Sequence, residues 1–315
     1  MSGMFQFDRV GAAELPPRPL HLAIGIFDGV HLGHRAVIEA AVQSARRSGG
    51  QSAVLTFAPH PSAVLRADQP TRLLMDRPAK ARVLAGIGVG AVITEPFTPE
   101  FARIAAEEFL PWLRQRLPQL AAVYVGENWR FGRDRRGDVA LLLREGRAQG
   151  VHVFSAPRVN LDGEPISSSR IRATLESGDV AGANAMLGYP YFAAGTVTPG
   201  KRLGHAIGFP TLNLAWSPEC KPRFGVYAVR VSGAKSLQAL PAVANYGLRP
   251  TVEQTSVPRL EVNVLGACPF GAGDVITVDW LEFVRPERKF SGVDELRIQI
   301  GRDRETAAGY FKRSG

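Results

Sequence analysis

The sequence predicts two domains of different class, an α/β domain with a parallel sheet followed by a β barrel that ends in a helix. Three observations predict this arrangement. The chain has 315 residues, which is more than one ordinary hydrophobic core usually fills. Its first half repeats short apolar runs at the spacing of strand–helix–strand units. Its second half consists of short segments punctuated by glycine and proline.

The strands of the first half are predicted from five apolar runs, which begin near Leu22, Ser52, Gly90, Ala121 and Val151. Helical patterns lie between them, at residues 35–47, 78–84, 99–117 and 138–149. The runs are apolar throughout rather than alternating, as expected of strands that helices cover on both faces. Such a sheet places its binding loops at the carboxyl ends of the strands.

After about Leu187 the spacing of strand–helix units gives way to short segments separated by glycine and proline. Six strand-like segments follow, at residues 195–198, 209–214, 225–231, 242–245, 260–265 and 275–283. A helical pattern returns at residues 293–311, where Leu296 and Ile300 share one apolar face. Several strands and a terminal helix predict a compact barrel closed by that helix. We therefore expect domains at residues 1–187 and 188–315.

The formal charge is +9, from 38 basic and 29 acidic residues, and both halves of the chain share the surplus. This balance fits polyanionic partners such as nucleic acid, a membrane surface or small phosphates, but it argues against a single basic tail. Two cysteines, Cys220 and Cys268, cannot form a disulfide framework in a chain of this length. The sequence shows neither a signal peptide nor an apolar run that could span a membrane, so we expect a cytoplasmic protein.

A glycine-containing turn with two histidines follows the first apolar run. The sequence Asp28–His34 (DGVHLGH) leads directly into the first helical pattern. His31 and His34 would face the start of that helix, where free backbone N–H groups and the positive end of the helix dipole attract phosphate. Imidazole can donate hydrogen bonds to phosphate oxygens and stabilise charge that develops on phosphorus. The arrangement suggests attack on the α-phosphate of a nucleoside triphosphate, with ordinary turn histidines and a metal-binding pair as alternatives.

Four short blocks carry a resemblance to a known family. They are GIFDGVHLGH at residues 25–34, TFAPHP at 56–61, VGENWRFGRDRRG at 125–137 and ISSSRIR at 166–172. In this order, at the ends of successive predicted strands, they resemble the signatures of the prokaryotic bifunctional riboflavin kinase/FMN adenylyltransferase family, also called FAD synthetase. The resemblance implies that the α/β domain is a Rossmann-like nucleotidyltransferase domain, which transfers an adenylyl group from ATP to FMN.

The resemblance also implies roles for individual residues. It implies that the catalytic residues of this domain are His31, His34, Asn128 and Arg170. It implies that ATP contacts Gly25, Phe27, Asp28, Gly29, Gly33, Ser168 and Ser169. It implies a flavin site formed by Phe57, Pro59, His60, Trp129 and Phe131. The alternatives are core packing for the aromatic residues, helix capping for His60 and the serines, and a solvated face for the arginines at 130–136. The family often has an acidic residue and Phe at 128 and 129, and usually Thr at 169.

The second half resembles the riboflavin kinase module of the same family, which implies a Greek-key-type β barrel. The block GFPTLN at residues 208–213 implies that Gly208, Thr211 and Asn213 bind the nucleotide. Because Thr211 and Asn213 are two residues apart, an extended strand points both to one side, where neutral oxygens suit Mg²⁺. Glu261 matches the catalytic glutamate of the family, with a cross-strand ion pair as the alternative. His205, where the family generally has Arg, and the loop at residues 266–274 depart from the pattern.

We therefore expect an enzyme that phosphorylates riboflavin with ATP to give FMN and then adenylylates FMN to give FAD and pyrophosphate. Three alternatives remain: an FAD synthetase whose barrel only binds flavin, a relative of the class I aminoacyl-tRNA synthetases, and a basic nucleic-acid-binding protein. No lysine-rich second loop, RNA-binding motif or clustered basic face is evident. The expected partners are therefore ATP, riboflavin and FMN with Mg²⁺, without nucleic acid or membrane, and no oligomeric state is predicted.

Overall fold

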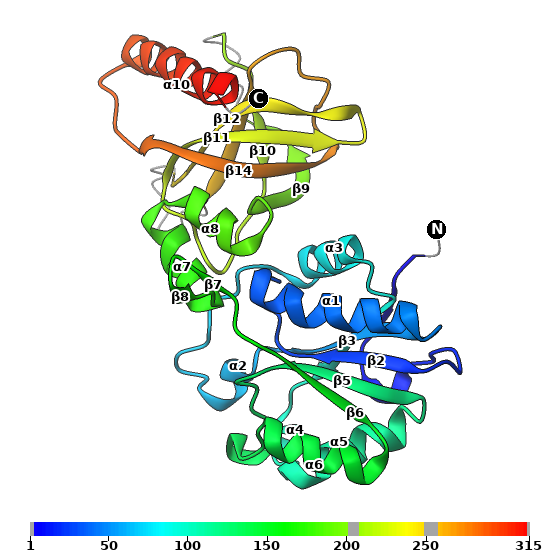
Figure 1. Ribbon diagram of the computed structural model, residues 1–315. Coiled ribbons are helices and arrows are strands. Elements are labelled where there is room, and N and C mark those ends of the chain that lie inside the picture. Colours follow the sequence, from blue (N-terminus) through cyan, green and yellow to red (C-terminus); the bar gives the residue numbers. More distant parts are fainter. Residues whose placement is uncertain (1–2, 201–207, 249–257, 314–315) are drawn as a thin grey trace. The chain divides into compact units, whose positions relative to one another are not determined.

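The computed structural model describes residues 3–200, 208–248 and 258–313 (Figure 1). Contacts between residues divide the chain into two compact units, Met1–Ser168 and Ser169–Gly315. The predicted domain boundary after residue 187 stays a prediction. No helix within the described ranges is long and apolar enough to cross a membrane.

The first unit contains a six-stranded sheet in which every neighbouring pair is parallel, so the predicted α/β class is confirmed. The order is β1-β4-β3-β2-β5-β6, with bounds Phe5–Phe7 (β1), Leu20–Ile24 (β2), Gln51–Ala58 (β3), Ala91–Pro96 (β4), Leu120–Gly126 (β5) and His152–Ala156 (β6). Strand β2 pairs with β3 on one side and β5 on the other. The chain therefore changes direction across the sheet at this point, where sheets of this kind bind ligands beyond the carboxyl ends of the strands.

Helices cover both faces of this sheet (Figure 1). Helices α1 (Leu32–Arg47) and α3 (Arg77–Ile87) belong to one hydrophobic core, and α5 (Ala106–Arg116) and α6 (Val139–Gln149) belong to the other. Strand β2 is buried along its whole length and contributes alternate side chains to the two cores. This double burial explains why its sequence is apolar except at His21, whose ring nitrogens form hydrogen bonds with Tyr124 and Ser48.

Three predicted helices lie close to their expected ranges, whereas the one expected at residues 99–117 is divided. It consists of α4 (Pro99–Ala102) and α5, with a break between them. The break frees the backbone carbonyl of Ile104, which accepts a hydrogen bond from the N–H of Arg133 at 2.7 Å and so anchors the loop after β5. The elements that the sequence did not predict are β1, η1 (Val10–Ala12), α2 (Pro61–Leu65), η2 (Arg133–Arg135), β7 (Asn160–Leu161), β8 (Glu164–Pro165) and α8 (Val180–Leu187).

The strands of the second unit close into a six-stranded antiparallel barrel. Its order is β10-β13-β12-β11-β14-β9, with bounds Phe192–Thr198 (β9), Leu212–Leu214 (β10), Gly225–Gly233 (β11), Ser236–Gly247 (β12), Arg259–Val264 (β13) and Val275–Pro286 (β14). Because β14 returns to lie beside β11, strands β11 to β14 form a Greek key. The helix α10 (Val293–Arg313) follows, and the predicted barrel with a C-terminal helix is confirmed.

Aromatic side chains fill the inside of the barrel, and α10 covers part of its outside. Tyr227, Tyr246 and Trp280 are fully buried, and the ring centroids of Tyr227 and Trp280 are 4.6 Å apart. On the outside, Val243 of β12 belongs to a cluster with Ala307 of α10. Successive residues of a barrel strand therefore face either the aromatic interior or the outer surface.

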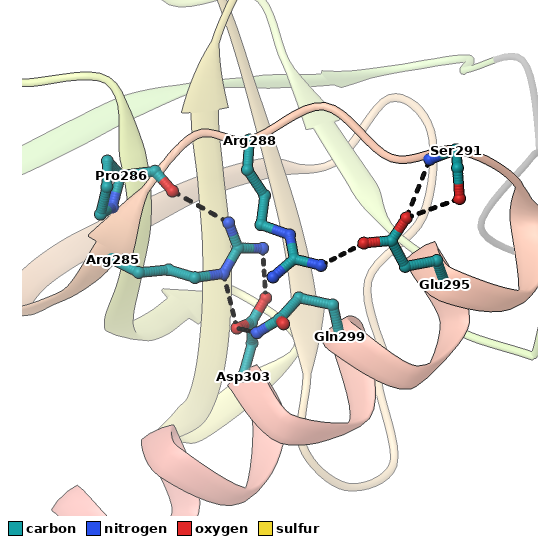
Figure 2. Close-up of polar contacts among 7 residues, drawn as sticks. All are labelled: Arg285, Pro286, Arg288, Ser291, Glu295, Gln299 and Asp303. Carbon is teal, nitrogen blue, oxygen red and sulfur yellow. Dashed lines mark hydrogen bonds and ion pairs between the residues drawn. The ribbon is translucent and has the colours of Figure 1, made fainter.

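A buried ion pair fastens α10 to the end of β14 (Figure 2). Arg285 donates from Nε and Nη2 to the two carboxylate oxygens of Asp303 at 2.8 and 2.7 Å. Gln299 adds a third hydrogen bond from Nε2 at 2.8 Å. The side chain of Asp303 is 6% exposed, so its charge is stabilised by these donors rather than by water.

Replacing Asp303 with asparagine should lower the free energy of unfolding of the barrel unit by about 3 kcal/mol, because Arg285 loses its counter-charge while it stays largely buried. Urea-induced unfolding measures this loss. Glu295→Gln is the matched control. Glu295 lies on α10 like Asp303 and pairs with Arg288 of the preceding segment (Figure 2), but its side chain is 40% exposed. Its effect should be much smaller, as for other exposed ion pairs. Equal effects of the two substitutions would contradict the role given to burial.

Candidate active sites

The signature turn after β2 has a backbone that few residues adopt. Phe27 and Gly29 have φ values of 50° and 82°, which let the chain reverse tightly before α1. A Cβ atom at Gly25 would lie 2.9 Å from the Phe27 ring, and one at Gly33 would lie 3.2 Å from the His31 ring. These two glycines therefore leave room for the rings that form the turn.

The structure brings His31 and His34 together at the start of α1. Their rings stack with centroids 3.6 Å apart. Nδ1 of His31, which is the N-cap residue, accepts a hydrogen bond from the backbone N–H of His34 at 3.3 Å. Phe27 is buried and places its ring edge-on to His34, with centroids 5.3 Å apart. The two imidazoles are thus held as one unit at the positive end of the helix dipole.

Both imidazoles are uncharged at neutral pH. Burial lowers the pKa of His31 to about 4. The pKa of His34 lies well below its usual value, because the ring is shielded from solvent and because His31 and Lys80 disfavour a positive charge there. Within the described residues, Nδ1 of His34 is buried without a hydrogen-bond partner. A neutral imidazole still donates one N–H, so the pair can bind phosphate oxygens without formal charge.

Acidification should destabilise the first unit as the pH falls from about 6.5 to about 4. A histidine with a lower pKa in the folded state binds its proton mainly after unfolding, so its contribution to stability is complete above pH ~6.5 and is lost below it. His31 alone should account for about 3 kcal/mol, and the lowered pKa of His21 acts in the same direction. Urea unfolding above and below this range measures the loss.

His31→Asn is the control for this pH dependence, because asparagine is also a good N-cap but cannot bind a proton. The variant should lose less stability on acidification than the natural chain does. A loss of the same size in both proteins would show that His31 is not its source.

Two charged residues lie close to the signature turn. Asp28 is 3% exposed, and its Oδ1 accepts a hydrogen bond from the backbone N–H of Leu74 at 2.9 Å. Lys80 of α3 donates from Nζ to the backbone carbonyl of Ile26 at 2.8 Å. Desolvation lowers the pKa of Lys80 to about 8, and the charge of Asp28 partly offsets this effect. Sequence reasoning missed Lys80, although it is one of few lysines in an arginine-rich chain.

A cavity of about 630 Å³ lies at the carboxyl ends of β2, β3 and β5, and aromatic residues form much of its wall. Trp129 and Phe131 stack with ring centroids 4.5 Å apart. Phe57 and His60 also line this cavity, whereas Pro59 lines a smaller one of about 80 Å³. The structure therefore brings four of the five predicted flavin-site residues to one cavity. Flat apolar walls of this kind suit a planar aromatic ligand.

Further parts of the cavity wall were not predicted. Phe97, Phe101 and Phe109 line it from the segment after β4 and from α4 and α5. The ring centroids of Phe109 and Phe131 are 5.3 Å apart, so these residues continue the aromatic wall. The sequence signal was weak, because apolar residues at helical spacing are equally typical of a core.

His60 has a structural role besides its place at the cavity. Its Nδ1 accepts a hydrogen bond from the backbone N–H of Ser62 at 3.1 Å and so caps α2. The capping alternative for His60 therefore describes part of its function in the fold. Its proposed contact with flavin stays a prediction.

The loop after β5 places polar side chains at the cavity. Asn128 is exposed and lines it, together with Arg130 and Arg135. Arg133 and Arg136 are exposed and lie outside its lining. The basic run that the sequence suggested as a solvated face is thus divided between the cavity and the surface.

The fourth sequence block spans the division between the units. Oγ of Ser168 donates a hydrogen bond to the backbone carbonyl of Asp28 at 2.8 Å, which ties Ser168 to the signature turn. Ser169 and Arg170 belong to the second unit, in the first turn of α7 (Ser168–Ser177), where the sequence predicted a helix. The roles of Ser169 and Arg170 at the nucleotide stay predictions.

Three polar residues form a row across neighbouring strands of the barrel. Asn213 of β10 pairs with Glu261 of β13, and Glu261 pairs with Asn245 of β12. Directly paired residues point to the same face of a sheet, which is the outer face here because Leu260 and Tyr246, their strand neighbours, are buried. The structure thus brings the predicted residues Asn213 and Glu261 together and adds Asn245, which was not among the predicted site residues.

Glu287 lies beside this row, directly after β14. Burial raises its pKa, and its carboxylate accepts hydrogen bonds from the backbone N–H of Leu248 and the side chain of Asn245. A Cβ atom at Gly247 would collide with the Glu287 carboxylate. The close approach of this glutamate therefore depends on glycine at the end of β12.

The remaining predicted residues of the barrel lie near the start of β10. Thr211 is exposed directly before the strand, and Gly208 has a φ of 86°. His205 lies outside the described residues. The loop at residues 266–274, which departs from the family pattern, is a hydrogen-bonded turn in which Oδ2 of Asp274 accepts from Lys235 and from the backbone N–H of Gly271, both at 2.8 Å.

Comparisons with known proteins find a family model for each half of the chain. Residues 14–170 match the family model for FAD synthetase, and residues 187–311 match that for riboflavin kinase. A protein of Escherichia coli (strain K12) named bifunctional riboflavin kinase/FMN adenylyltransferase is 36% identical over 300 residues, which cover 95% of each chain. A protein of the same name from Bacillus subtilis (strain 168) is 35% identical over 298 residues, which cover 92% of each chain.

A solved structure also resembles this chain along almost its whole length. A crystal structure described as a macrolide-efflux protein from Streptococcus pneumoniae matches with a TM-score of 0.85 and 27% sequence identity, covering 97% of this chain and 98% of that one. The domain matches and the identity along almost the whole length lead to one conclusion. The chain belongs to the bifunctional riboflavin kinase/FMN adenylyltransferase family.

Proposed function

We propose that the barrel unit phosphorylates riboflavin with ATP to give FMN, and that the first unit adenylylates FMN with a second ATP to give FAD and pyrophosphate. One observation carries this proposal. A single chain of this family contains both a stacked histidine pair at a helix N-terminus and a row of polar residues with a central glutamate on its barrel. The first arrangement suits adenylyl transfer, and the second suits phosphorylation of a hydroxyl group.

Adenylyl transfer uses the signature turn and the aromatic cavity. The isoalloxazine ring lies against Trp129 and Phe131, and an oxygen of the FMN phosphate attacks the α-phosphorus of ATP. The bond from that phosphorus to the bridging oxygen breaks, and pyrophosphate leaves. His31 and His34 donate hydrogen bonds to the oxygens on which charge develops, together with the backbone N–H groups at the start of α1. Arg170 is proposed to bind the leaving pyrophosphate through charge-assisted hydrogen bonds.

Phosphorylation uses the polar row on the barrel. Glu261 accepts the proton of the riboflavin 5′-hydroxyl as its oxygen attacks the γ-phosphorus of ATP, and the bond to ADP breaks. Asn213 and Asn245 lie on either side of Glu261. Their amides can orient the carboxylate or the substrates by hydrogen bonds.

Magnesium is the cation that we propose for the barrel site. The described residues contain no group of three or more His, Cys, Asp or Glu that could hold a metal, so a cage made of protein side chains alone is not expected there. Thr211 and Asn213 would hold Mg²⁺ with neutral oxygens, and phosphate oxygens would supply further ligands. The ion would neutralise charge on the phosphates of ATP. We further propose that the protein works in the cytoplasm on these small phosphates, without nucleic acid or membrane.

Product analysis with the purified chain tests this function. Incubation with riboflavin and Mg-ATP should yield FMN first and then FAD, and incubation with FMN and Mg-ATP should yield FAD. Conversion of FMN but not riboflavin would favour the alternative in which the barrel only binds flavin. Absence of both products under oxidising and reducing conditions would refute the proposal.

A further inference from the structure

Lys80 occupies a position that is unusual for a basic residue of this chain. The sequence has 6 lysines among its 38 basic residues, and this lysine reaches between α3 and the sheet. Its Nζ donates to the Ile26 carbonyl at 2.8 Å and to Oγ1 of Thr56 at 3.4 Å. Thr56 donates to the same carbonyl at 2.9 Å. A compact ammonium group fits this junction better than the broad, planar guanidinium that the chain otherwise prefers.

The charged and titratable groups around Lys80 connect it to the signature turn. The Asp28 carboxylate stabilises its charge, and Arg77 of the same helix opposes it. His34 lies close enough to Lys80 for the ammonium group to disfavour protonation of the imidazole, and His31 stacks on His34 with a similar effect. The lysine therefore interacts with both the backbone and the side chains of the turn.

We propose that Lys80 is a positioning residue for adenylyl transfer, which fixes the segment from Ile26 to Asp28 and thereby the place of His31 and His34 at the start of α1. This inference rests on the proposed function of the first unit. Without the ammonium group, the Ile26 carbonyl loses its 2.8 Å hydrogen bond and the buried Asp28 carboxylate loses a neighbouring cation. Both changes free the turn to adopt other conformations.

The test compares Lys80→Met with Arg82→Met in the full chain. Arg82 is an exposed cation on the same helix, so its replacement removes the same charge from the same helix. We expect K80M to lower kcat for FAD formation from FMN by about 10- to 100-fold, and R82M to leave it unchanged. FMN formation from riboflavin should stay at the natural rate in both variants, because it belongs to the other unit.

The pH profile separates this role from a merely structural one. Loss of the neighbouring positive charge should raise the pKa of His34 in K80M, because protonation of the imidazole is then less opposed. The acid limb of the pH profile, where the rate of FAD formation falls as the pH is lowered, should therefore shift to higher pH. A general loosening of α3 would lower the rate without moving this limb in that direction.

Thr56→Val is a milder second variant, which keeps the lysine charge and removes the hydroxyl that shares the Ile26 carbonyl. It should lower FAD formation by about 2- to 10-fold with the acid limb unmoved.

The proposal is overturned if K80M forms FAD as fast as R82M, if both activities of K80M fall together, or if its acid limb does not move. Should K80M fail to fold, a natural rate in T56V would overturn it. Absence of FAD formation in the natural chain would instead refute the proposed function itself.

Discussion

Glu261→Gln should lower the formation of FMN from riboflavin by about 10²- to 10⁴-fold, which is the range that general base catalysis contributes. Glutamine keeps the size of the side chain but cannot take the hydroxyl proton. Because Asn213 and Asn245 still lie beside it, the KM values for ATP and riboflavin should change little. FAD formation from added FMN should not change. Initial rates with chromatographic separation of the flavins measure both reactions.

Glu282→Gln is the matched control for this substitution. Glu282 is exposed on β14, where it pairs with Ala228 and lies outside the polar row. Its replacement removes the same charge from the same barrel and should leave FMN formation at the natural rate. If Glu261→Gln raised KM without lowering kcat, Glu261 would act in binding alone, and its proposed role as proton acceptor would be rejected.

His34→Ala should lower FAD formation from FMN and ATP by about 10²- to 10³-fold, the cost of removing one donor to developing charge. His31→Ala should cost at least as much, because His31 also caps α1. The double variant should fall by less than the product of the two, since stacked residues act as a unit. Rates of FAD and pyrophosphate release measure the effect.

The exposed His152 on β6 provides the control for the histidine variants. His152→Ala should form FAD at the natural rate, and all of these variants should still convert riboflavin to FMN. If His34→Ala formed FAD within about twofold of the natural rate, the loss of transition-state stabilisation would be smaller than the contribution of one ordinary hydrogen bond. Such a result would show that the turn does not stabilise the transition state.

The signature turn could be predicted because its information is local. Glycines at 25, 29 and 33 mark a backbone that must bend or approach a ring closely, and the apolar pattern of residues 35–47 fixes the helix that follows. Strand β2 is apolar on both faces except at His21, and burial of a strand on both faces can be predicted without knowing which strands lie beside it. From these residues alone, the placement of two histidines at a helix N-terminus follows.

The polar row on the barrel depends on information that is not local. That Glu261 faces Asn213 and Asn245 follows from the pairing of β10, β13 and β12, and this register is set by contacts far apart in the chain. Motif resemblance suggested Glu261 and Asn213 singly. Asn245 was not among the predicted site residues, and it becomes part of the site through the pairing of β12 with β13.

Lys80 and the aromatic wall illustrate the same limit. From the sequence, the single lysine of an amphipathic helix is expected to be exposed to solvent. Only the packing of α3 against the sheet brings its Nζ to the Ile26 carbonyl. Phe101 and Phe109 read as core residues, yet both line the cavity. The division of the helix expected at 99–117 has a similar origin, since Ile104 bonds to Arg133, a residue of a distant loop.

The uncharged state of the stacked histidines has a consequence for how the reaction ends. A cluster of cations would attract ATP strongly, but it would hold the departing polyanion just as strongly, because charge-assisted hydrogen bonds are the stronger ones. Neutral donors favour the charge distribution of the transition state over that of the free products. We therefore expect the two histidines to hold the departing pyrophosphate weakly, so that any dependence of its release on ionic strength comes from charged residues such as Arg170.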